Sequence, residues 1–83
     1  MSRSPEVQML PEAVKAWRKQ REMSQKELAN ASDVSLGLIG LIEVGERQPR
    51  LMNALNIARA LGVPLKAIAL VRADVANLEV VAS

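Results

Sequence analysis

One short segment in the middle of the chain, 24–43, contains two signals for the start of a helix with a signal for a turn between them. Ser24 and Glu27 have the S-x-x-E spacing of a capping box, in which the hydroxyl and the carboxylate bind otherwise unpaired backbone N–H groups. The Ser-Asp pair at 32–33 favours a turn, because both side chains compete for nearby backbone groups, and Ser35 can then cap a second helix. The segment therefore predicts two short helices joined by a tight turn, at 25–31 and 35–43.

The residues before this segment predict an arm and one amphipathic helix. Residues 1–10 are polar and show no helical pattern until their end, so we expect a loose amino-terminal arm. Leu10, Val14 and Trp17 have the spacing of one helix face, with basic residues elsewhere on the cylinder. A proline suited to a first helical turn opens this stretch. The pattern predicts a helix over 11–22.

The residues after the segment predict two more helices and a tail. Beyond a polar loop that contains a proline, apolar residues recur at spacings of three and four from Leu51 to Leu61, and a glycine stop follows. Pro64 can open a fifth helix. The tail, 72–83, fits a helix and a strand equally well. We therefore expect an all-α fold of five helices in one compact domain, 11–71.

The amino-acid composition argues against most catalytic and metal-binding chemistry. Hydrophobic residues make up 49% of the 83 residues, yet Phe and Tyr are absent and Trp17 is the only aromatic residue, so the core must be aliphatic. There is no Cys and no His, which removes disulfides, the usual nucleophile–base pairs and nearly all zinc or iron sites. Binding of RNA or of single strands relies on aromatic stacking, for which the chain offers one residue. We therefore expect a binding protein that is not an enzyme and that uses no cofactor and no metal.

The charges give a weak indication of an anionic partner. The net charge is +2, but basic residues dominate the stretch from Lys15 to Lys26. Such a cluster fits a nucleic-acid partner, although charge alone favours a solvated helix face. No stretch approaches about 18 consecutive apolar residues, and no apolar region follows Arg3 as in an export signal. We expect a cytoplasmic protein without a membrane partner.

The order and spacing of these motifs resemble the Cro and cI-like repressors, which are grouped with the XRE regulators. The resemblance runs from Val14 to about Ile68. It implies a lambda-repressor-like helix-turn-helix domain of a phage-type or bacterial repressor, which binds double-stranded DNA as a homodimer without a cofactor. The matching residues are Met23-Ser24-Gln25-x-x-Leu28-Ala29, Val34-Ser35-x-x-x-Ile39-x-x-Ile42-Glu43-x-Gly45, Pro49, Leu51, Leu55, Ile57-Ala58 and Ala60-Leu61-Gly62-Val63.

The resemblance also implies roles for particular residues, since the third helix of the family enters the major groove. Groove or base contacts are implied at Ser35, Leu36, Gly37, Leu38 and Leu41. Phosphate contacts are implied at Ser24, Gln25, Arg47, Gln48 and Arg50. A structural ion pair between the first and third helices is implied for Arg18 and Glu43. Without the resemblance, Ser24 is a plain helix cap and the stretch from Arg47 to Arg50 is an ordinary solvated loop.

The third helix departs from the family pattern, in which exposed positions carry side chains that hydrogen-bond to base edges. Here the corresponding positions are all apolar: Leu36, Gly37, Leu38, Gly40 and Leu41. Three interpretations stay open. The leucines contact thymine methyl groups while phosphate contacts and DNA shape supply the rest, or they bind a protein, as an antirepressor or co-regulator would. In the third, the arm, the tail or a second subunit buries some of them.

The end of the chain supplies the last expectation. Residues 68–81 are too apolar to be left in water by a monomer of this size. We therefore expect a homodimer, with 72–83 as its dimerisation element.

Overall fold

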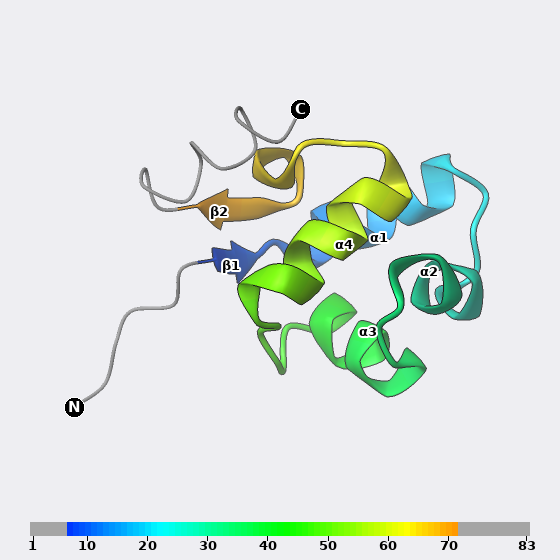
Figure 1. The fold of residues 1–83 in the computed structure, drawn as a ribbon, viewed down its shortest axis with the longest axis horizontal. Helices are drawn as coiled ribbons and strands as arrows, with labels where there is room; N and C mark the ends of the chain where they lie inside the picture. Colours follow the sequence, from blue (N-terminus) through cyan, green and yellow to red (C-terminus); the bar gives the residue numbers. More distant parts are fainter. Residues whose placement is uncertain (1–6, 72–83) are drawn as a thin grey trace.

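The computed structural model describes residues 7–71, which form four α-helices, one 3-10 helix and a two-stranded sheet (Figure 1). In chain order the elements are β1 (Val7–Met9), α1 (Pro11–Gln20), α2 (Gln25–Ser32), α3 (Leu36–Glu43), α4 (Leu51–Leu61), η1 (Leu65–Ala67) and β2 (Ala69–Val71). Helix α4 packs against α2, β1 and η1, while α3 packs against α1 and α2. In Figure 1 the sheet lies on one side of α4, and α2 and α3 lie on the other. None of the described helices is long and apolar enough to span a membrane.

The first four predicted helices are confirmed, with a small difference at one end. Ser24 and Ser35 are the N-caps of α2 and α3, as their spacing predicts, and Gly62 ends α4 with a φ of 70°. Helix α1 ends at Gln20, earlier than the expected residue 22. The reason is that Glu22 adopts a left-handed φ of 57°, which a right-handed helix does not contain.

The fold is mostly helical and not all-α as expected, because it contains a small sheet, and the described part of the expected loose arm, residues 7–9, is a strand of that sheet. Residues 1–6 of the expected arm lie outside the described residues. Strand β1 pairs antiparallel with β2, with Met9 opposite Ala69. Val7 and Met9 are buried, Met9 with only 2% of its surface exposed, while Gln8 between them is exposed. This alternation has the period of two that a half-buried strand requires. Three residues are too few to produce a recognisable pattern in the sequence.

The fifth helix expected after Pro64 is also absent from the described part of the chain. Residues Leu65–Ala67 form only the short η1, and Ile68 leaves it with a φ of −125° toward the extended backbone of β2. Extended backbone is favoured because the β1 region supplies partners for it, including the Leu10 N–H, which donates to the Ile68 carbonyl oxygen at 2.8 Å. The expected dimerisation element, 72–83, lies outside the described residues.

The core is aliphatic, as the composition requires. Its members include four residues from α2, α3 and the turn between them, namely Leu28, Val34, Ile39 and Ile42. Trp17 is only partly buried, and the Arg21 guanidinium lies 5.1 Å from the centroid of its ring. Arg21 also donates from Nε to the Leu61 carbonyl oxygen at 2.8 Å. This arginine therefore joins the end of α1 to the end of α4.

A buried carboxylate joins three helices. Glu43, at the end of α3, has 1% of its side chain exposed. It accepts hydrogen bonds from Nε and Nη2 of Arg18 in α1, at 2.7 and 3.0 Å, and from Nε2 of Gln25 in α2, at 3.1 Å. Arg18 donates once more, from Nη1 to the Met23 carbonyl oxygen at 2.9 Å. The structure thus contains an ion pair between the first and third helices, and Gln25 extends it to the second.

The surroundings of Glu43 favour its charged form. Burial raises the pKa of the carboxyl group, but hydrogen bonds from Arg18 and Gln25, together with the charges of Arg18 and Lys15, outweigh burial and bring the pKa below its ordinary value. The bond to Glu43 in turn raises the pKa of Arg18. A carboxyl group whose pKa falls on folding stabilises the protein above its unfolded-state pKa. That contribution is lost as the pH falls through the folded-state pKa.

We expect Met9→Ala to destabilise the domain, because it removes a buried side chain from the sheet and leaves a cavity. The free energy of unfolding should fall by about 2 to 4 kcal/mol. Gln8→Ala, on the exposed face of the same strand, is the matched control and should change it by less than about 0.5 kcal/mol. Urea denaturation followed by circular dichroism measures both values. Equal small effects would show that residues 7–9 are a loose arm after all.

We expect Glu43→Gln to lower the free energy of unfolding at neutral pH by about 3 kcal/mol, since it leaves the Arg18 charge without its partner in a largely buried site. The difference from the wild type should narrow below about pH 4.3, the unperturbed value for glutamate, because there the wild type loses the same contribution by protonation. Urea denaturation across a pH series measures this difference.

The control for this experiment is Glu46→Gln. Glu46 is exposed and its carboxylate makes no ion pair with any described residue, so its replacement should leave the free energy of unfolding nearly unchanged at every pH. A difference between wild type and Glu43→Gln that stays constant down to acidic pH would contradict the assigned role of Glu43.

Candidate nucleic-acid interface

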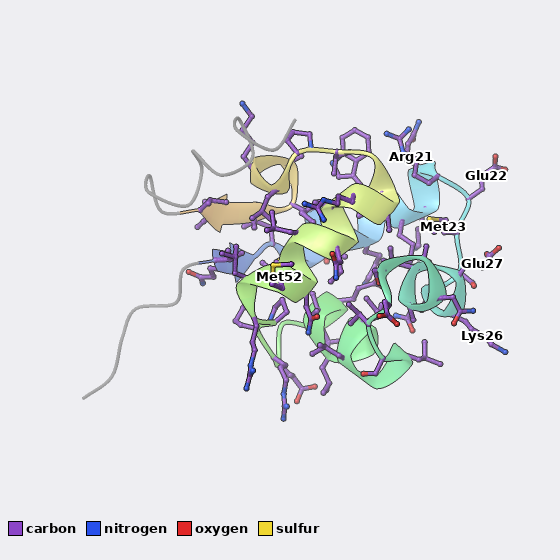
Figure 2. All side chains as sticks on the ribbon, viewed as in Figure 1. Arg21, Glu22, Met23, Lys26, Glu27 and Met52 are labelled. Atoms are coloured by element: carbon purple, nitrogen blue, oxygen red, sulfur yellow. The ribbon has the colours of Figure 1, made fainter. Side chains whose placement is uncertain are left out.

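Helix α2 begins with a complete capping box. The Ser24 Oγ accepts a hydrogen bond from the Glu27 N–H at 3.0 Å, and Glu27 Oε1 accepts one from the Ser24 N–H at 2.8 Å. Hydrogen bonding with Ser24 lowers the pKa of the Glu27 carboxyl group, and the Ser24 backbone has a larger effect than the Ser24 side chain. Figure 2 shows Lys26 beside Glu27, and both point into solvent. Because Ser24 occupies the Glu27 N–H, the N–H groups of Gln25 and Lys26 are the ones at this helix start that have no intrahelical acceptor and are open to an anion.

Gln25, the first residue of α2, is oriented by the buried carboxylate of Glu43. Its Nε2 donates one hydrogen to Glu43 Oε1, which leaves the second amide hydrogen without an acceptor among the described residues. The side chain is partly exposed. Gln25 can therefore donate to a partner outside the domain while its position is fixed relative to α3.

The surface of α3 that points away from the core has an apolar character throughout. We name this surface the outward face and define it as Leu36, Gly37, Gly40, Leu41 and Val44. At 3.6 residues per turn these positions lie opposite Ile39 and Ile42, which are fully buried. Leu36 is 48% exposed, and Val44, directly after the helix, is 62% exposed. No side chain of the outward face can donate or accept a hydrogen bond.

Two other residues expected to contact DNA lie at the edge of this surface. Leu38 is half-buried and packs against the core, so Leu36 and Leu41 are the leucines of the outward face. The Ser35 Oγ accepts a hydrogen bond from the Leu38 N–H at 3.1 Å as the cap of α3. The Ser35 hydroxyl is exposed and keeps its own proton for a partner.

The two glycines of the outward face have no role in the fold of the described residues. A Cβ atom added to Gly37 or Gly40 would meet no atom within 4 Å. Both residues lie within the regular helix and neither has a positive φ. Glycine nevertheless destabilises a helix by about 1 kcal/mol relative to alanine. The fold therefore gives no reason for glycine at these positions.

A basic loop, residues 46–50, follows α3. It begins after Gly45, whose positive φ of 80° favours glycine. Arg47 and Arg50 are exposed, and neither side chain pairs with a described residue. Gln48 Oε1 accepts a hydrogen bond from the Met9 N–H at 2.7 Å, so this side chain anchors the loop to β1.

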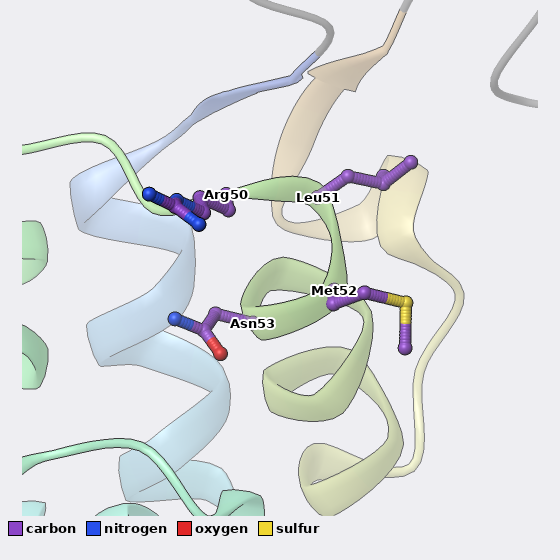
Figure 3. Close-up of a pocket in the computed structure, with 4 residues that line it drawn as sticks. All are labelled: Arg50, Leu51, Met52 and Asn53. Atoms are coloured by element: carbon purple, nitrogen blue, oxygen red, sulfur yellow. The ribbon is translucent and has the colours of Figure 1, made fainter.

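The start of α4 forms a shallow pocket lined by Arg50, Leu51, Met52 and Asn53 (Figure 3). In Figure 3 the side chains of Arg50 and Asn53 lie on one side of the first turn, and those of Leu51 and Met52 lie on the other. Arg50 is the N-cap, and its side chain forms no capping bond. The first N–H groups of α4 thus lack intrahelical acceptors and carry the positive end of the helix dipole.

Asn53 is the one polar residue at this surface that the sequence analysis did not select. The signal that could have identified it is its spacing of three residues from Arg50, which places the two side chains together on one side of a helix start. Potential metal ligands do not gather at the pocket, since the described residues contain no group of three or more that could hold a metal ion.

The structure thus brings the expected site residues to connected elements. Ser24 and Gln25 lie at the start of α2, Arg47 and Arg50 lie in the basic loop, and α3 lies between these segments in the chain. Figure 1 shows α3 and the loop after it together along one side of the molecule, away from β2 and η1. Contact of these residues with DNA stays a prediction.

Comparison with known proteins agrees with this arrangement. The model of the HTH_3 helix-turn-helix family matches residues 14–68. The restriction-modification controller protein C.AhdI from Aeromonas hydrophila is a similar solved structure, with 28% sequence identity and a TM-score of 0.66 over 69% of this chain and 86% of that chain. An HTH_3 family transcriptional regulator from Vibrio cholerae is 30% identical, with a TM-score of 0.66 over 72% of this chain. No curated protein matches.

The extent of these matches differs. The chain covers 34% of the length of the Vibrio cholerae regulator, so the likeness to that protein is one of domains. The family match covers more than half of this chain and includes all of α2, α3 and α4, which confirms the resemblance seen in the sequence. The chain therefore belongs to the HTH_3 (XRE-type) helix-turn-helix family of DNA-binding transcriptional regulators, which are not enzymes.

Proposed function

We propose that this protein is a transcriptional repressor that binds preferred sites on double-stranded DNA with α3 in the major groove. The observation that carries the proposal is the exposure of the outward face of α3, where Leu36, Gly37 and Val44 are exposed and Gly40 and Leu41 are half-buried. The start of α2 and the basic loop border α3, and both offer donors to an anionic partner. An α-helix fits the major groove, which is about 12 Å wide.

Phosphate contacts are proposed on the two bordering elements. At the start of α2, Ser24 and Gln25 add a hydroxyl and an amide donor to the free N–H groups of the helix terminus. In the basic loop, Arg47 and Arg50 supply charge without a competing acidic partner among residues 7–71. Gln48 uses its carbonyl oxygen for Met9 and keeps its amide nitrogen for a phosphate. These contacts set the position of the protein on DNA without reading sequence.

The exposure of Leu36 and Val44 favours a second candidate function, a protein-interaction module on the same fold. The apolar surface is smaller than the sequence suggests, because Leu38 packs against the core. A change of Leu38 to aspartate would therefore disturb the fold, and Leu36→Asp is the better probe of partner binding. This candidate requires that the wild type bind no duplex DNA even at low salt.

We also propose that the protein binds DNA as a homodimer, so that two α3 helices enter successive major grooves about 34 Å apart. Part of the apolar end of the chain is already used within one subunit, since Ile68 and Ala69 are buried in its core. Leu70 is different, because it is 60% exposed on β2. We therefore assign Leu70 to the subunit interface.

Sedimentation equilibrium tests the dimer. We expect the wild type to associate to a dimer at micromolar concentration and Leu70→Asp to shift the equilibrium toward the monomer, because a charge in an apolar interface is costly. Gln8→Asp places a charge on the residue that pairs with Leu70 across the sheet. It tests whether any negative charge on this face of the sheet shifts the equilibrium toward the monomer as much as Leu70→Asp does. A wild type that stays monomeric at high concentration would refute the proposal.

Fluorescence anisotropy with duplexes enriched from a random library tests DNA binding. We expect Arg47→Ala and Arg50→Ala each to weaken binding on preferred and unrelated duplexes alike and to reduce the dependence of log K on log salt by about one unit. Lys66→Ala is the matched control, since it removes one charge from exposed η1, away from α3. No binding by the wild type at low salt, or an equal loss in Lys66→Ala, would contradict the proposed interface.

A further inference from the structure

We propose that α3 selects its DNA sites through apolar contact with the 5-methyl groups of thymine and not through hydrogen bonds to base edges. This inference rests on the proposed function and adds the chemical feature of the DNA that the outward face reads. In the major groove each base pair presents donors and acceptors, and the thymine methyl is the only apolar group among them. A reading surface without polar side chains can gain binding energy only from that group and from DNA shape.

The inventory of hydrogen-bonding groups on α3 supports this chemistry. Glu43, the only charged residue of the helix, is buried and bonded to Arg18 and Gln25. Ser35 engages its oxygen as the helix cap, and its remaining hydroxyl proton lies before the first residue of α3, outside the outward face. The remaining groups that face outward are hydrocarbon or bare backbone, so the outward face cannot pair with guanine, cytosine or adenine through its side chains.

The placement of the two leucines suits contact with methyl groups. Leu36 is the first residue of α3 and is 48% exposed, and the first residues of a recognition helix are those that contact base edges. Around the helix, Gly40 and Gly37 lie between Leu36 and Leu41 at 3.6 residues per turn. Within the helix, the outward face is thus a low glycine strip between two isobutyl groups, and Val44 lies beyond the end of this strip, directly after the helix.

The glycines point to close approach by an external partner. Apart from the adjoining residues and backbone of α3 itself, no described atom lies within 4 Å of a Cβ added to Gly37 or Gly40, and glycine weakens the helix relative to alanine. A bare backbone at these positions allows the helix axis to lie nearer to the floor of the groove. That depth is what short aliphatic side chains need in order to reach a methyl group.

The charge of the bordering loop favours DNA over a protein as the occupant, since its two arginines outweigh the single carboxylate of Glu46. Arg47 and Arg50 are exposed and have no acidic partner among residues 7–71. Lys26 points into solvent from the start of α2 (Figure 2). An apolar strip bordered by unpaired basic groups is complementary to a groove whose floor carries methyl groups and whose rims carry phosphates.

Replacement of thymine by deoxyuridine tests the proposal, because uracil keeps every hydrogen-bonding group and lacks only the methyl. Single replacements are scanned through the half-sites of a duplex enriched from a random library, and affinity is measured by fluorescence anisotropy. We expect one or two positions at which the replacement weakens binding by about fourfold, the value of one buried methyl group. Replacements outside the contacted positions should have no effect.

Leucine truncation assigns these positions to side chains. At one position of the duplex, Leu36→Ala or Leu41→Ala should bind the thymine-containing and the uracil-containing duplex with equal affinity. Lys66→Ala is the control, because Lys66 is exposed on η1, away from α3, and this variant should keep the full preference for thymine. Loss of that preference in Lys66→Ala would overturn the assignment.

Gly37→Ala and Gly40→Ala separate a role in binding from a role in folding. Each should raise the melting temperature by about 4 °C, since alanine favours the helix and meets no neighbour. Each should nevertheless weaken binding to the preferred duplex by roughly tenfold, because the added methyl holds the helix away from the base contacts. A variant that is more stable and binds as tightly as the wild type would overturn the requirement for close approach.

The outcomes distinguish this inference from the proposed function. A wild type that binds no duplex at low salt overturns both, and a stoichiometric complex with a protein that Leu36→Asp abolishes would then identify the other occupant. A wild type that binds preferred duplexes, but with equal affinity for thymine and uracil at every position, leaves the proposed function intact and overturns methyl recognition alone.

Discussion

The orientation of α3 depends on one buried carboxylate. Glu43 accepts hydrogen bonds from Arg18 of α1 and from Gln25 of α2, so a rotation of α3 about its axis would leave a charge unpaired in the interior. Such an unpaired buried charge raises the free energy of the folded protein. The observed orientation of α3 relative to α1 and α2 is therefore much more stable than orientations in which α3 is rotated. The same orientation buries Ile39 and Ile42 and leaves Leu36 and Val44 of the outward face exposed.

The sheet has a comparable effect on the basic loop. Strand β1 lies far from this loop in the sequence, yet the Met9 N–H donates to Gln48 Oε1 and thereby limits the freedom of Arg47 and Arg50. The sheet also unites the two ends of the described chain, because β1 precedes the first helix and β2 follows the last. The surface proposed for DNA is therefore supported by contacts that lie behind it, between segments of widely separated sequence.

Two features of α3 meet at the outward face: glycines that lower the stability of the helix, and apolar side chains that are exposed. Two glycines without a packing role lower the stability of α3, and the exposed Leu36 gains nothing from the core of its own domain. Both features disfavour the isolated domain slightly, and both are understandable if a partner completes the surface. Phosphate contacts at the bordering elements would supply most of the affinity, whereas the apolar strip would supply the preference among sequences.

The sequence alone determined the elements whose signals are local. The Ser24 and Glu27 box, the Ser35 cap and the apolar spacing from Leu51 to Leu61 each lie within a few turns of helix, and each predicted element is present. Only the tertiary structure decided which leucines of α3 face outward, that Gln48 bonds to Met9, and that residues 7–9 and 69–71 are strands. The physical reason is that a three-residue strand has too few residues to show a period, and its hydrogen bonds exist only when a distant segment of the chain lies beside it.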